Sequence, residues 1–331
     1  MRWSAVVPAI MLAGCLGFHA GPMPGEPAKD AYAALDVDGG KVRVHYVDVG
    51  EGPAVVLIHG FASSLVVWDD VIKVLAKNHR VIAMDLKGFG WTDRPEGDYS
   101  PPAQARIVKA LLDARGVKTA SVVGHSWGAS VALAFALAEP TRVTKLALYS
   151  AWAFEDQLPT FVVWSRAALI GEALFRLFYT ERPEDWIVRA YHDKRYINYQ
   201  LVTAVSEAMH RPGARAAGLA VVRGQRYAAL EQRYRSIEQP TLIMWGREDR
   251  VSLVGFGKRL AAELPNAELI VYPDTGHFPM IESKQQSTTA LVAFLDEPDP
   301  VVAPAPAPAP PTAPAPPPTS TAPPATPEPT P

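Results

Sequence analysis

The sequence predicts an α/β fold with a mostly parallel sheet, and three observations lead to this prediction. Short continuous apolar runs recur along the chain, and segments with helical spacing separate most of them. Strands buried on both faces have this composition, and strands that alternate with helices build parallel sheets. The 331 residues are 48% hydrophobic and 20% charged, which is typical of a globular chain with one large domain or two modest ones.

The expected strands follow one another along the chain. Residues 41–47 alternate polar and apolar side chains after the turn Asp38-Gly39-Gly40, which predicts a half-exposed strand. The apolar runs predict buried strands at residues 54–58, 81–84, 121–123, 146–149, 242–245 and 269–272. Helical spacing is found between them, at residues 65–76, 105–114, 129–138 and 256–264.

The alternation of strands and helices is interrupted once, between Trp152 and Glu238. This stretch has no convincing strand, yet it holds 13 of the 30 aromatic residues of the chain. We therefore expect a helical cap over residues 152–238, inserted before the last two strands of a core formed by residues 31–151 and 239–296. Most of the aromatic rings are expected to build the small core of that cap.

Both ends of the chain differ in composition from a folded domain. Arg2, the apolar run at residues 3–12 and two small residues before Cys15 have the features of a secretory signal peptide over residues 1–14. Residues 15–30 are expected to form a flexible tether. Half of the 32 prolines lie in residues 298–331, which predicts a disordered Pro/Ala-rich tail over residues 297–331.

The segment Leu12-Ala13-Gly14-Cys15 resembles the lipobox of bacterial lipoproteins, in which the cysteine thiol receives a diacylglyceryl group. The resemblance implies an exported protein that is lipid-anchored in the bacterial cell envelope through Cys15. Leu16 after the cysteine implies the outer membrane, where the cell has one. An ordinary cleaved signal, or an apolar N-terminus that contains a cysteine by chance, is the alternative. The tail is interpreted as a spacer, and its partner is unknown.

Charge and cysteine content exclude several classes of protein. Lys and Arg total 32 against 34 for Asp and Glu, so the net charge of −2 gives no basic footprint for nucleic acid. The single cysteine excludes an internal disulfide framework and a Cys-rich zinc site. No run of 18 or more apolar residues occurs, so the sequence does not predict a membrane-spanning helix.

A candidate nucleophile lies between the expected strand 121–123 and the expected helix 129–138. The residues there are Gly124-His125-Ser126-Trp127-Gly128. A Gly-x-Ser-x-Gly pentapeptide also occurs by chance, so its position on a strand-to-helix turn carries the argument. A serine on so sharp a turn is strained, and the residues two positions away must be small enough to let the chain pass.

With this motif, residues 31–296 resemble the α/β-hydrolase superfamily, whose other marks follow in the family's order. These marks are the oxyanion segment His59-Gly60-Phe61, the loop 85–95 that begins Asp85-Leu86-Lys87-Gly88-Phe89-Gly90 and has Thr92 for the usual serine, Trp245-Gly246-Arg247-Glu248-Asp249, and Gly276-His277-Phe278. The resemblance implies an eight-stranded, mostly parallel sheet flanked by helices.

The resemblance also implies a catalytic triad of Ser126, Asp249 and His277. A serine hydroxyl is a poor nucleophile that needs a base within hydrogen-bond reach, and His277 is the well-placed candidate. Asp249 would hold the imidazole tautomer, and its competitors for this role are Glu248 and Asp274. Some members of the family carry the acid after the strand that precedes the cap, where this chain offers none nearby.

The remaining motif residues are expected to support the triad. The backbone N–H groups of Phe61 and Trp127 would form the oxyanion hole. The elbow and the oxyanion loop are shaped by Gly124, Gly128, His59 and Gly60. His59 and His125 are interpreted as structural hydrogen-bonding residues, and Asp85 and Asp93 as residues that order their loop. No metal or organic cofactor is implied, because the triad carries its own proton transfer.

The substrate class is narrowed by the same residues. A serine at the elbow argues against the haloalkane dehalogenase and epoxide hydrolase branches, which use an aspartate, and the oxyanion segment lacks the Gly-rich continuation of hormone-sensitive-lipase-like esterases. Esterases and lipases, carbon–carbon bond hydrolases of ring-cleavage products, amidases or aminopeptidases, and perhydrolases share the triad. The aromatic, nearly neutral cap and the predicted export favour a small-molecule ester or lipid-like substrate. A non-catalytic surface scaffold is the alternative of another class.

Overall fold

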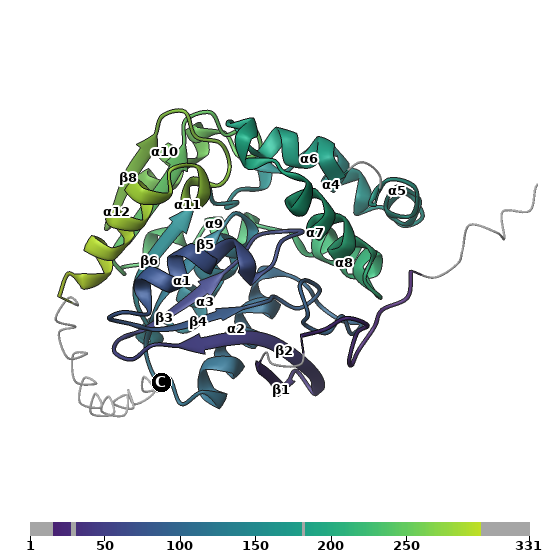
Figure 1. Ribbon diagram of the computed structural model, residues 1–331, viewed down its shortest axis with the longest axis horizontal. Helices are drawn as coiled ribbons and strands as arrows, with labels where there is room; N and C mark the ends of the chain where they lie inside the picture. Colours follow the sequence, from purple (N-terminus) through teal and green to yellow (C-terminus); the bar gives the residue numbers. More distant parts are fainter. Residues whose placement is uncertain (1–15, 28–30, 181–182, 299–331) are drawn as a thin grey trace, which may run out of the picture. The chain divides into compact units, whose positions relative to one another are not determined.

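The computed structural model describes residues 16–27, 31–180 and 183–298, which contain one eight-stranded sheet (Figure 1). The strands are β1 (Ala31–Val37), β2 (Gly40–Val49), β3 (Ala54–Ile58), β4 (Arg80–Met84), β5 (Ala120–His125), β6 (Val143–Tyr149), β7 (Thr241–Gly246) and β8 (Ala267–Tyr272). Their order across the sheet is β1-β2-β4-β3-β5-β6-β7-β8. The β1–β2 and β2–β4 pairs are antiparallel and the others parallel, so the expected eight-stranded, mostly parallel sheet is confirmed.

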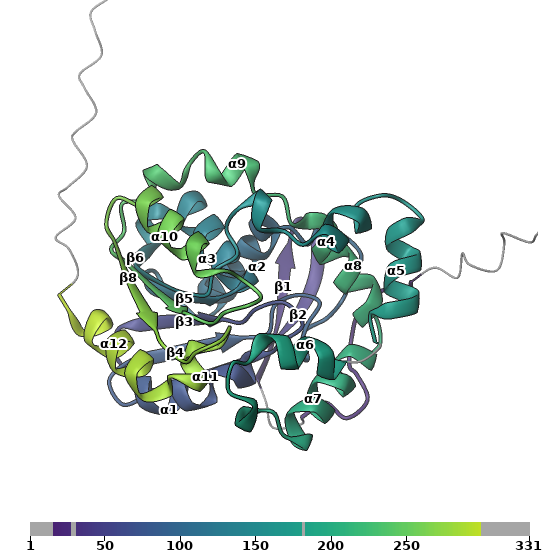
Figure 2. The same ribbon diagram turned by 90° about the horizontal axis from the view of Figure 1, so that it is seen from above.

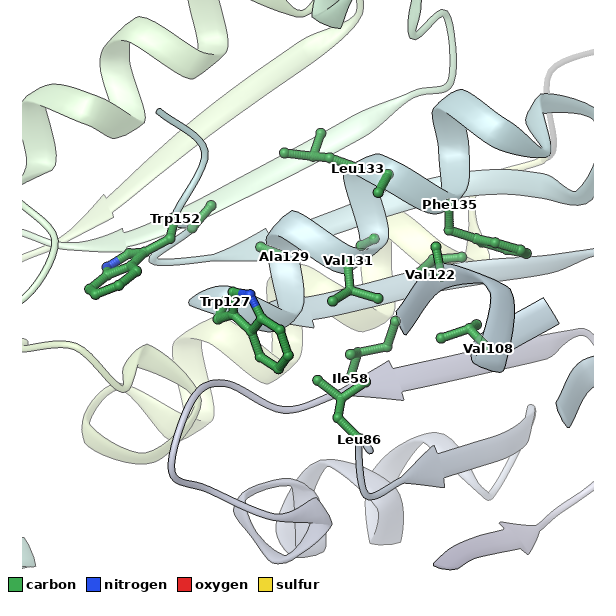
Figure 3. Close-up of a cluster of buried hydrophobic side chains, with 14 of the residues drawn as sticks. Ile58, Leu86, Val108, Val122, Trp127, Ala129, Val131, Leu133, Phe135 and Trp152 are labelled. Carbon is green, nitrogen blue, oxygen red and sulfur yellow. The ribbon is translucent and has the colours of Figure 1, made fainter. Parts of the chain in front are cut away.

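Helices cover both faces of this sheet because its strands are apolar on both sides. The core helices are α1 (Asp69–Leu75), α2 (Pro101–Ala114), α3 (Trp127–Ala138), α10 (Val254–Glu263), α11 (Pro279–Glu282) and α12 (Lys284–Asp296). Successive residues of a strand point to opposite faces. Val56 of β3 therefore joins the buried cluster with α2, α3 and α10, and Val55 joins the cluster with α1, α11 and α12. Figure 3 shows part of the first cluster, where Phe135 of α3 lies beside Val122 of β5.

The parallel register brings the carboxyl ends of the central strands to one edge of the sheet. Ile58 at the end of β3 is paired with Gly124 near the end of β5, and Gly246 at the end of β7 is paired with Tyr272 at the end of β8. The loops that follow these strands carry the motifs singled out in the sequence. Open α/β sheets bind their ligands at this edge.

Between β6 and β7 the described chain forms helices and turns but no strand, which agrees with the expected helical insertion. The helices of this cap are α4 (Thr160–Ser165), α5 (Ile170–Phe178), α6 (Pro183–Ala190), α7 (Tyr199–His210), α8 (Ala214–Gly224) and α9 (Ala228–Glu231). In Figures 1 and 2, α5 to α8 gather on one side of the molecule, away from α10 and α12.

Of the 13 aromatic residues of the cap region, eight are buried or partly buried, in keeping with the expectation that most would be enclosed. The other five are exposed to solvent: Trp164, Phe178, Trp186, Tyr196 and Tyr199. The physical reason is that the cap helices are short and few. Each of them can bury only the side that faces another helix or the core, so the rings on the outer side stay exposed.

β1 was not among the strands that the apolar pattern predicted. Its residues pair with β2 across the turn at Asp38 and Gly39, from Ala31 opposite Tyr46 to Val37 opposite Gly40. It lies at the edge of the sheet, where only Leu35 of its seven residues is buried. An edge strand with so little apolar surface gives no clear sequence signal.

Residues 16–27, which we name the N-terminal strap, lie against the core although residues 15–30 were expected to be a flexible tether. His19 exchanges two backbone hydrogen bonds with Arg94, at 2.9 and 2.7 Å, and the N–H of Gly21 donates to Asp93 Oδ1 at 3.0 Å. Met23 is buried, with its sulfur 2.8 Å from a guanidinium nitrogen of Arg94. Backbone bonds at His19 and Gly21 and an ion pair between Glu26 and Arg43 hold the strap, and composition predicts neither.

The predicted signal peptide, Cys15 and the predicted tail beyond residue 298 lie outside the described residues. None of the helices in the described ranges is long and apolar enough to span a membrane.

Candidate active site

Ser126 lies on the sharp turn between β5 and α3, with φ 53° and ψ −120°. This backbone conformation is rare and strained for a residue other than glycine. A Cβ on Gly124 would lie 2.6 Å from the carbonyl oxygen of Gly128, and a Cβ on Gly128 would lie 2.3 Å from that of His59. Both glycines are therefore required for the elbow to pass between its neighbours, as the motif predicts.

The backbone of Ser126 is fixed by the strand next to it. Its N–H donates to the carbonyl of Tyr149 at 2.8 Å, and its carbonyl accepts from the N–H of Trp152 at 3.1 Å. Ser126 is buried, and a Cβ placed on Gly60 would lie 3.0 Å from the Cβ of Ser126. The oxyanion segment that begins at His59 therefore passes directly beside the serine.

The loops after β7 and β8 bring together a histidine and a carboxylate. His277 Nδ1 donates to Asp249 Oδ2 at 2.8 Å, and both side chains are buried. The other carboxylate oxygen, Oδ1, accepts from the N–H groups of Val251 at 2.8 Å and Ser252 at 2.9 Å. The Asp249 carboxylate is therefore oriented by its own loop before it meets the imidazole.

The two competing acids are placed elsewhere. Glu248 Oε2 accepts from the N–H of Thr275 at 3.0 Å, so this side chain ties the loops after β7 and β8 together. Asp274 lies in the turn before Thr275 with φ 52°, a conformation that aspartate adopts more readily than most residues. Among these three acids, Asp249 is the one that contacts the ring of His277.

His277 also lies close to the elbow through His125. The two imidazole rings are 4.8 Å apart, and His125 Nε2 donates to the carbonyl oxygen of His277 at 2.9 Å. Burial holds the pKa of His125 well below its usual range, so the ring is neutral. His125 thereby joins the serine loop to the histidine loop, in keeping with its expected structural role.

The candidate oxyanion donors are free within the described chain. The backbone N–H groups of Phe61 and Trp127 donate to no acceptor in the described residues. Trp127 begins α3, where the first N–H groups have no partner within the helix and attract negative charge. These are the two groups that the sequence predicts for the oxyanion hole.

His59 fixes the oxyanion segment from inside. Its Nδ1 donates to the carbonyl of Gly60 at 2.7 Å, and its Nε2 accepts from the N–H of Leu86 at 3.0 Å. This pattern assigns one neutral tautomer, and burial lowers the pKa of the His59 imidazole accordingly. His59 is thus a structural residue, as the sequence analysis expected.

Asp85 and Asp93 order the loop after β4. Asp85 accepts from the N–H groups of Leu65 at 2.7 Å and Trp91 at 2.8 Å, and from His45 Nδ1 at 2.6 Å. Burial alone would raise the pKa of Asp85, but the bond from His45 and the neighbouring histidine lower it. Asp93 accepts from the strap and from the N–H of Arg43 at 3.2 Å. Both aspartates support the loop.

Sequence reasoning missed Glu282, which connects the cap to the histidine loop. Its Oε2 accepts from the N–H groups of His192 at 2.8 Å and Asp193 at 3.0 Å, and its Oε1 accepts from the N–H of Gly276 at 3.0 Å. The N–H of His277 itself donates to the carbonyl of Ala190 at 2.7 Å. No sequence signal marks Glu282, because its partners are backbone groups that the fold alone brings to it.

A small cavity lies where the cap meets the core, beside the oxyanion segment. Its lining combines core and cap residues: Ala62, Ser63, Gly88, Phe89, Gly90, Arg94, Tyr179, Ala208, Met209 and Ala214. Burial lowers the pKa of the Arg94 guanidinium to about 10, so the group remains charged at neutral pH. Near the elbow, the buried indole N–H groups of Trp127 and Trp152 have no partner in the described chain.

Comparison with known proteins gives a consistent result. The family model described as alpha/beta hydrolase fold matches residues 53–284. An uncharacterised protein of Mycobacterium tuberculosis is 32% identical over 266 residues, 76% of this chain and 77% of that protein. The 2-hydroxy-6-oxo-2,4-heptadienoate hydrolase of Pseudomonas putida is 29% identical, over 74% of this chain and 90% of the enzyme. The structure of a thermophilic esterase from Thermogutta terrifontis superposes with a TM-score of 0.71 at 25% identity, covering 81% and 98% of the two chains.

Proposed function

Because the chain belongs to the α/β-hydrolase family, we propose that it is a serine hydrolase that cleaves carboxylic esters through Ser126, His277 and Asp249. The observation that carries the proposal is a strained serine at the elbow together with a histidine whose Nδ1 is already bound to a buried carboxylate. The similarity to a thermophilic esterase supports the choice of ester over other acyl compounds.

The hydrogen bonds assign a role to each group in the proposed reaction. Asp249 accepts the Nδ1 proton of His277, so Nε2 is the nitrogen left to act as base. Nε2 takes the proton of Ser126 while Oγ attacks the carbonyl carbon of the ester. The N–H groups of Phe61 and Trp127 donate to the tetrahedral oxyanion, an interaction worth about 3 kcal/mol for each donor.

Collapse of the tetrahedral intermediate breaks the carbon–oxygen bond. The alcohol leaves with the proton that His277 had taken, and the acyl group stays on Ser126. Water then attacks the acyl-enzyme, giving its proton to Nε2, and the second collapse releases the carboxylic acid and the free serine. Asp249 stabilises the imidazolium in both halves of the reaction.

The test is hydrolysis of p-nitrophenyl esters of increasing acyl chain length. We expect Ser126→Ala to lower kcat by about 10⁴-fold or more. Asp249→Asn should lower kcat by about 10⁴-fold because the amide holds the wrong tautomer of the histidine. Asp274→Asn is the matched control, since it makes the same change at an exposed acid in a turn that asparagine also adopts, and it should leave kcat within about twofold. Full turnover by Ser126→Ala would contradict the proposal.

Carbon–carbon bond hydrolysis is the second candidate, and two observations favour it. The relative from Pseudomonas putida is named for a substrate that is an oxo-dienoate, and such a compound carries a carboxylate. The charged guanidinium of Arg94 lines the cavity between cap and core, where it would attract an acid. Turnover of that dienoate, without turnover of any ester, would replace the first candidate by the second. Absence of both, with no labelling of Ser126 by a fluorophosphonate, would leave a binding scaffold.

We also propose that the protein is exported and anchored to a membrane of the cell envelope by a lipid on Cys15. The support is the lipobox-like segment that ends at this cysteine. Cells fed labelled palmitate should produce labelled protein, and Cys15→Ser should abolish the label. A wild-type chain without label would contradict the anchor and leave the catalytic proposal intact.

A further inference from the structure

The outer side of the cap presents a set of apolar side chains to solvent, which we name the cap apolar face. It consists of Val163, Trp164, Ala167, Ala168, Leu169, Ile170, Leu177 and Phe178. Leu169 is 80% exposed, and Trp164 and Phe178 are each 61% exposed. Leu177 and Phe178 follow Ile170 by seven and eight positions, which places all three on one side of α5. Soluble monomers seldom expose such a set unless it contacts something.

The polar groups beneath this face are used inside the cap. Arg223 of α8 donates to the carbonyl of Ser165 at 3.1 Å and to both carboxylate oxygens of Glu172 at 2.9 Å. Arg166 donates to the carbonyl of Gln225 and pairs with Glu155 at 2.6 Å. The turn between α4 and α5 is therefore held from within by charged groups, while its outer side is apolar.

Leu169, the most exposed residue of the face, has a backbone conformation that is unfavourable for leucine. Its φ of 67° lies in the left-handed region, where a leucine is strained and a glycine is not. The side chain is almost free of protein contacts, so packing within the molecule does not explain a leucine at this position. Strained residues of this kind occur where a side chain is displayed for a function.

The start of the described chain lies at the same end of the molecule. Leu16 packs against the core cluster, the ring of Phe18 stacks on Tyr99 at 6.1 Å, and the N–H of His19 lies 2.9 Å from where a Cβ of Gly213 would be. Gly213 precedes α8, the helix that holds the α4–α5 turn. Figures 1 and 2 show the strap, in purple, on the same side as α5 and α8, with α12 on the opposite side.

We propose that the cap apolar face lies on the surface of a lipid bilayer. Cys15 is joined directly to Leu16, the first residue of the bound strap, so acyl chains on Cys15 would enter the membrane next to the strap. A short, fixed connection leaves the protein little freedom to turn, and it holds this end toward the lipid. The orientation rests on the anchor proposed above, whereas the binding of the face to lipid does not.

The composition of the cap apolar face and its position beside the proposed lipid anchor both favour lipid over a second protein as its partner. Tryptophan and aliphatic side chains on a short helical turn are the groups that insert at the boundary between headgroups and acyl chains. A diacylglyceryl group would already hold two acyl chains in the bilayer, and a second contact from the protein would fix how the enzyme lies on the surface. The cap apolar face would supply that second contact beside the anchor.

The experiment uses the chain from residue 15 onward with Cys15→Ser, which keeps every described residue and carries no acyl group. Flotation with vesicles of phosphatidylethanolamine and phosphatidylglycerol measures the bound fraction. We expect the parent chain to float and the partition coefficient to fall about fivefold in Leu169→Gly and about tenfold in Trp164→Ser, because each removes apolar area that the lipid would bury. Leu169→Gly should keep or raise the Tm, because it relieves a strained backbone.

Leu253→Gly is the matched control, since Leu253 is 60% exposed and precedes α10, away from α5. It should leave the partition coefficient within about twofold. A parent chain that does not float, or an equal loss in Leu169→Gly and Leu253→Gly, would overturn the inference. So would a dimer in sedimentation that Trp164→Ser dissociates, because the face would then join two copies. Ester turnover is measured on the same samples, so that failure of the catalytic proposal is seen separately.

Discussion

α3 in the core and α5 in the cap are both rich in apolar residues, yet they are used in opposite ways. Eleven of the twelve residues of α3 are buried, because the sheet lies on one side of the helix, and α2 and the short helix Tyr234–Ser236 enclose the rest. In α5, only Gly171 and Phe175 of nine residues are buried. Apolar content alone therefore does not predict burial, and the number of neighbouring layers decides it.

Replacing a phenylalanine by alanine in each helix should show the difference between α3 and α5 most clearly. Phe135→Ala in α3 removes a fully buried ring and should lower the free energy of unfolding by about 3–5 kcal/mol. Phe178→Ala in α5 removes a mostly exposed ring and should cost less than about 0.5 kcal/mol. Urea unfolding of both variants is the measurement. Equal losses would mean that Phe178 is enclosed in solution as Phe135 is, which would contradict the exposure on which the comparison rests.

A second prediction concerns the carboxylate that joins the two regions. Each carboxylate oxygen of Glu282 accepts from backbone N–H groups, one oxygen from the cap and the other from the histidine loop. Glu282→Gln replaces one of these oxygens by an amide nitrogen, which cannot accept a hydrogen bond. Leaving a buried donor unpaired costs about 1–3 kcal/mol. If the histidine loop moves to avoid this cost, His277 is displaced from Ser126, and kcat should fall about tenfold. Glu263→Gln, which breaks a surface pair with Arg235, is the control and should not change kcat.

The Glu282 prediction separates a positioning role from a purely structural one. Burial raises the pKa of this carboxyl, and protonation would remove one acceptor, so the acid side of the rate profile should change in Glu282→Gln. A variant with lower Tm but an unchanged kcat and pH profile would show that Glu282 stabilises the fold without positioning His277.

The smallest expected effect is on the free energy of unfolding, when an ion pair of the core and one of the cap are each removed and the pH is lowered. Hydrogen bonds from Arg80 and Arg115 hold the pKa of Asp48 below its usual 3.8, against the opposing effect of burial. Its contribution to stability is therefore complete above pH 3.8 and is lost as the pH falls through the lowered folded-state pKa. Asp48→Asn should cost about 1 kcal/mol at pH 7 and nothing at the acid limit.

The cap offers a counterpart in Glu172, whose pair with Arg223 is half exposed. Glu172→Gln should cost less than Asp48→Asn at pH 7, because solvent screens the cap pair more strongly. Chemical denaturation at a series of pH values measures both. A larger loss in the cap variant would mean that the α4–α5 turn stabilises the whole molecule.

The core could be predicted from sequence because its residues are enclosed on all sides. The run at residues 54–58 coincides with β3, and the other expected strands and helices lie within the observed ones or a few residues from their ends. The pairing of His277 with Asp249 is implied by the resemblance to the α/β-hydrolase superfamily, which carries its acid and its histidine after two late strands, and the two side chains do meet in the structure. Ser126 required only the strand-to-helix context of its motif.

The remainder depends on contacts that leave no pattern in the chain. The strap binds through backbone groups of His19 and Gly21 and through the side chain of Glu26, and Glu282 binds backbone N–H groups from distant loops. The exposure of Trp164 and Leu169 depends on how few helices surround them, which composition does not encode. The roles of Ser126, His277 and Asp249 in catalysis stay predictions until the variants are assayed.

The strap also bears on the order in which the molecule folds. It is the first described segment of the chain, but Gly21 bonds to a residue 72 positions later, and His19 lies against Gly213 in the cap. Contacts of such separation form late, after the loops that they close are already ordered. We expect the strap to be placed last during folding, and to come away first when the native state opens. The lifetime of the folded protein would then depend on how firmly the strap is held against the core.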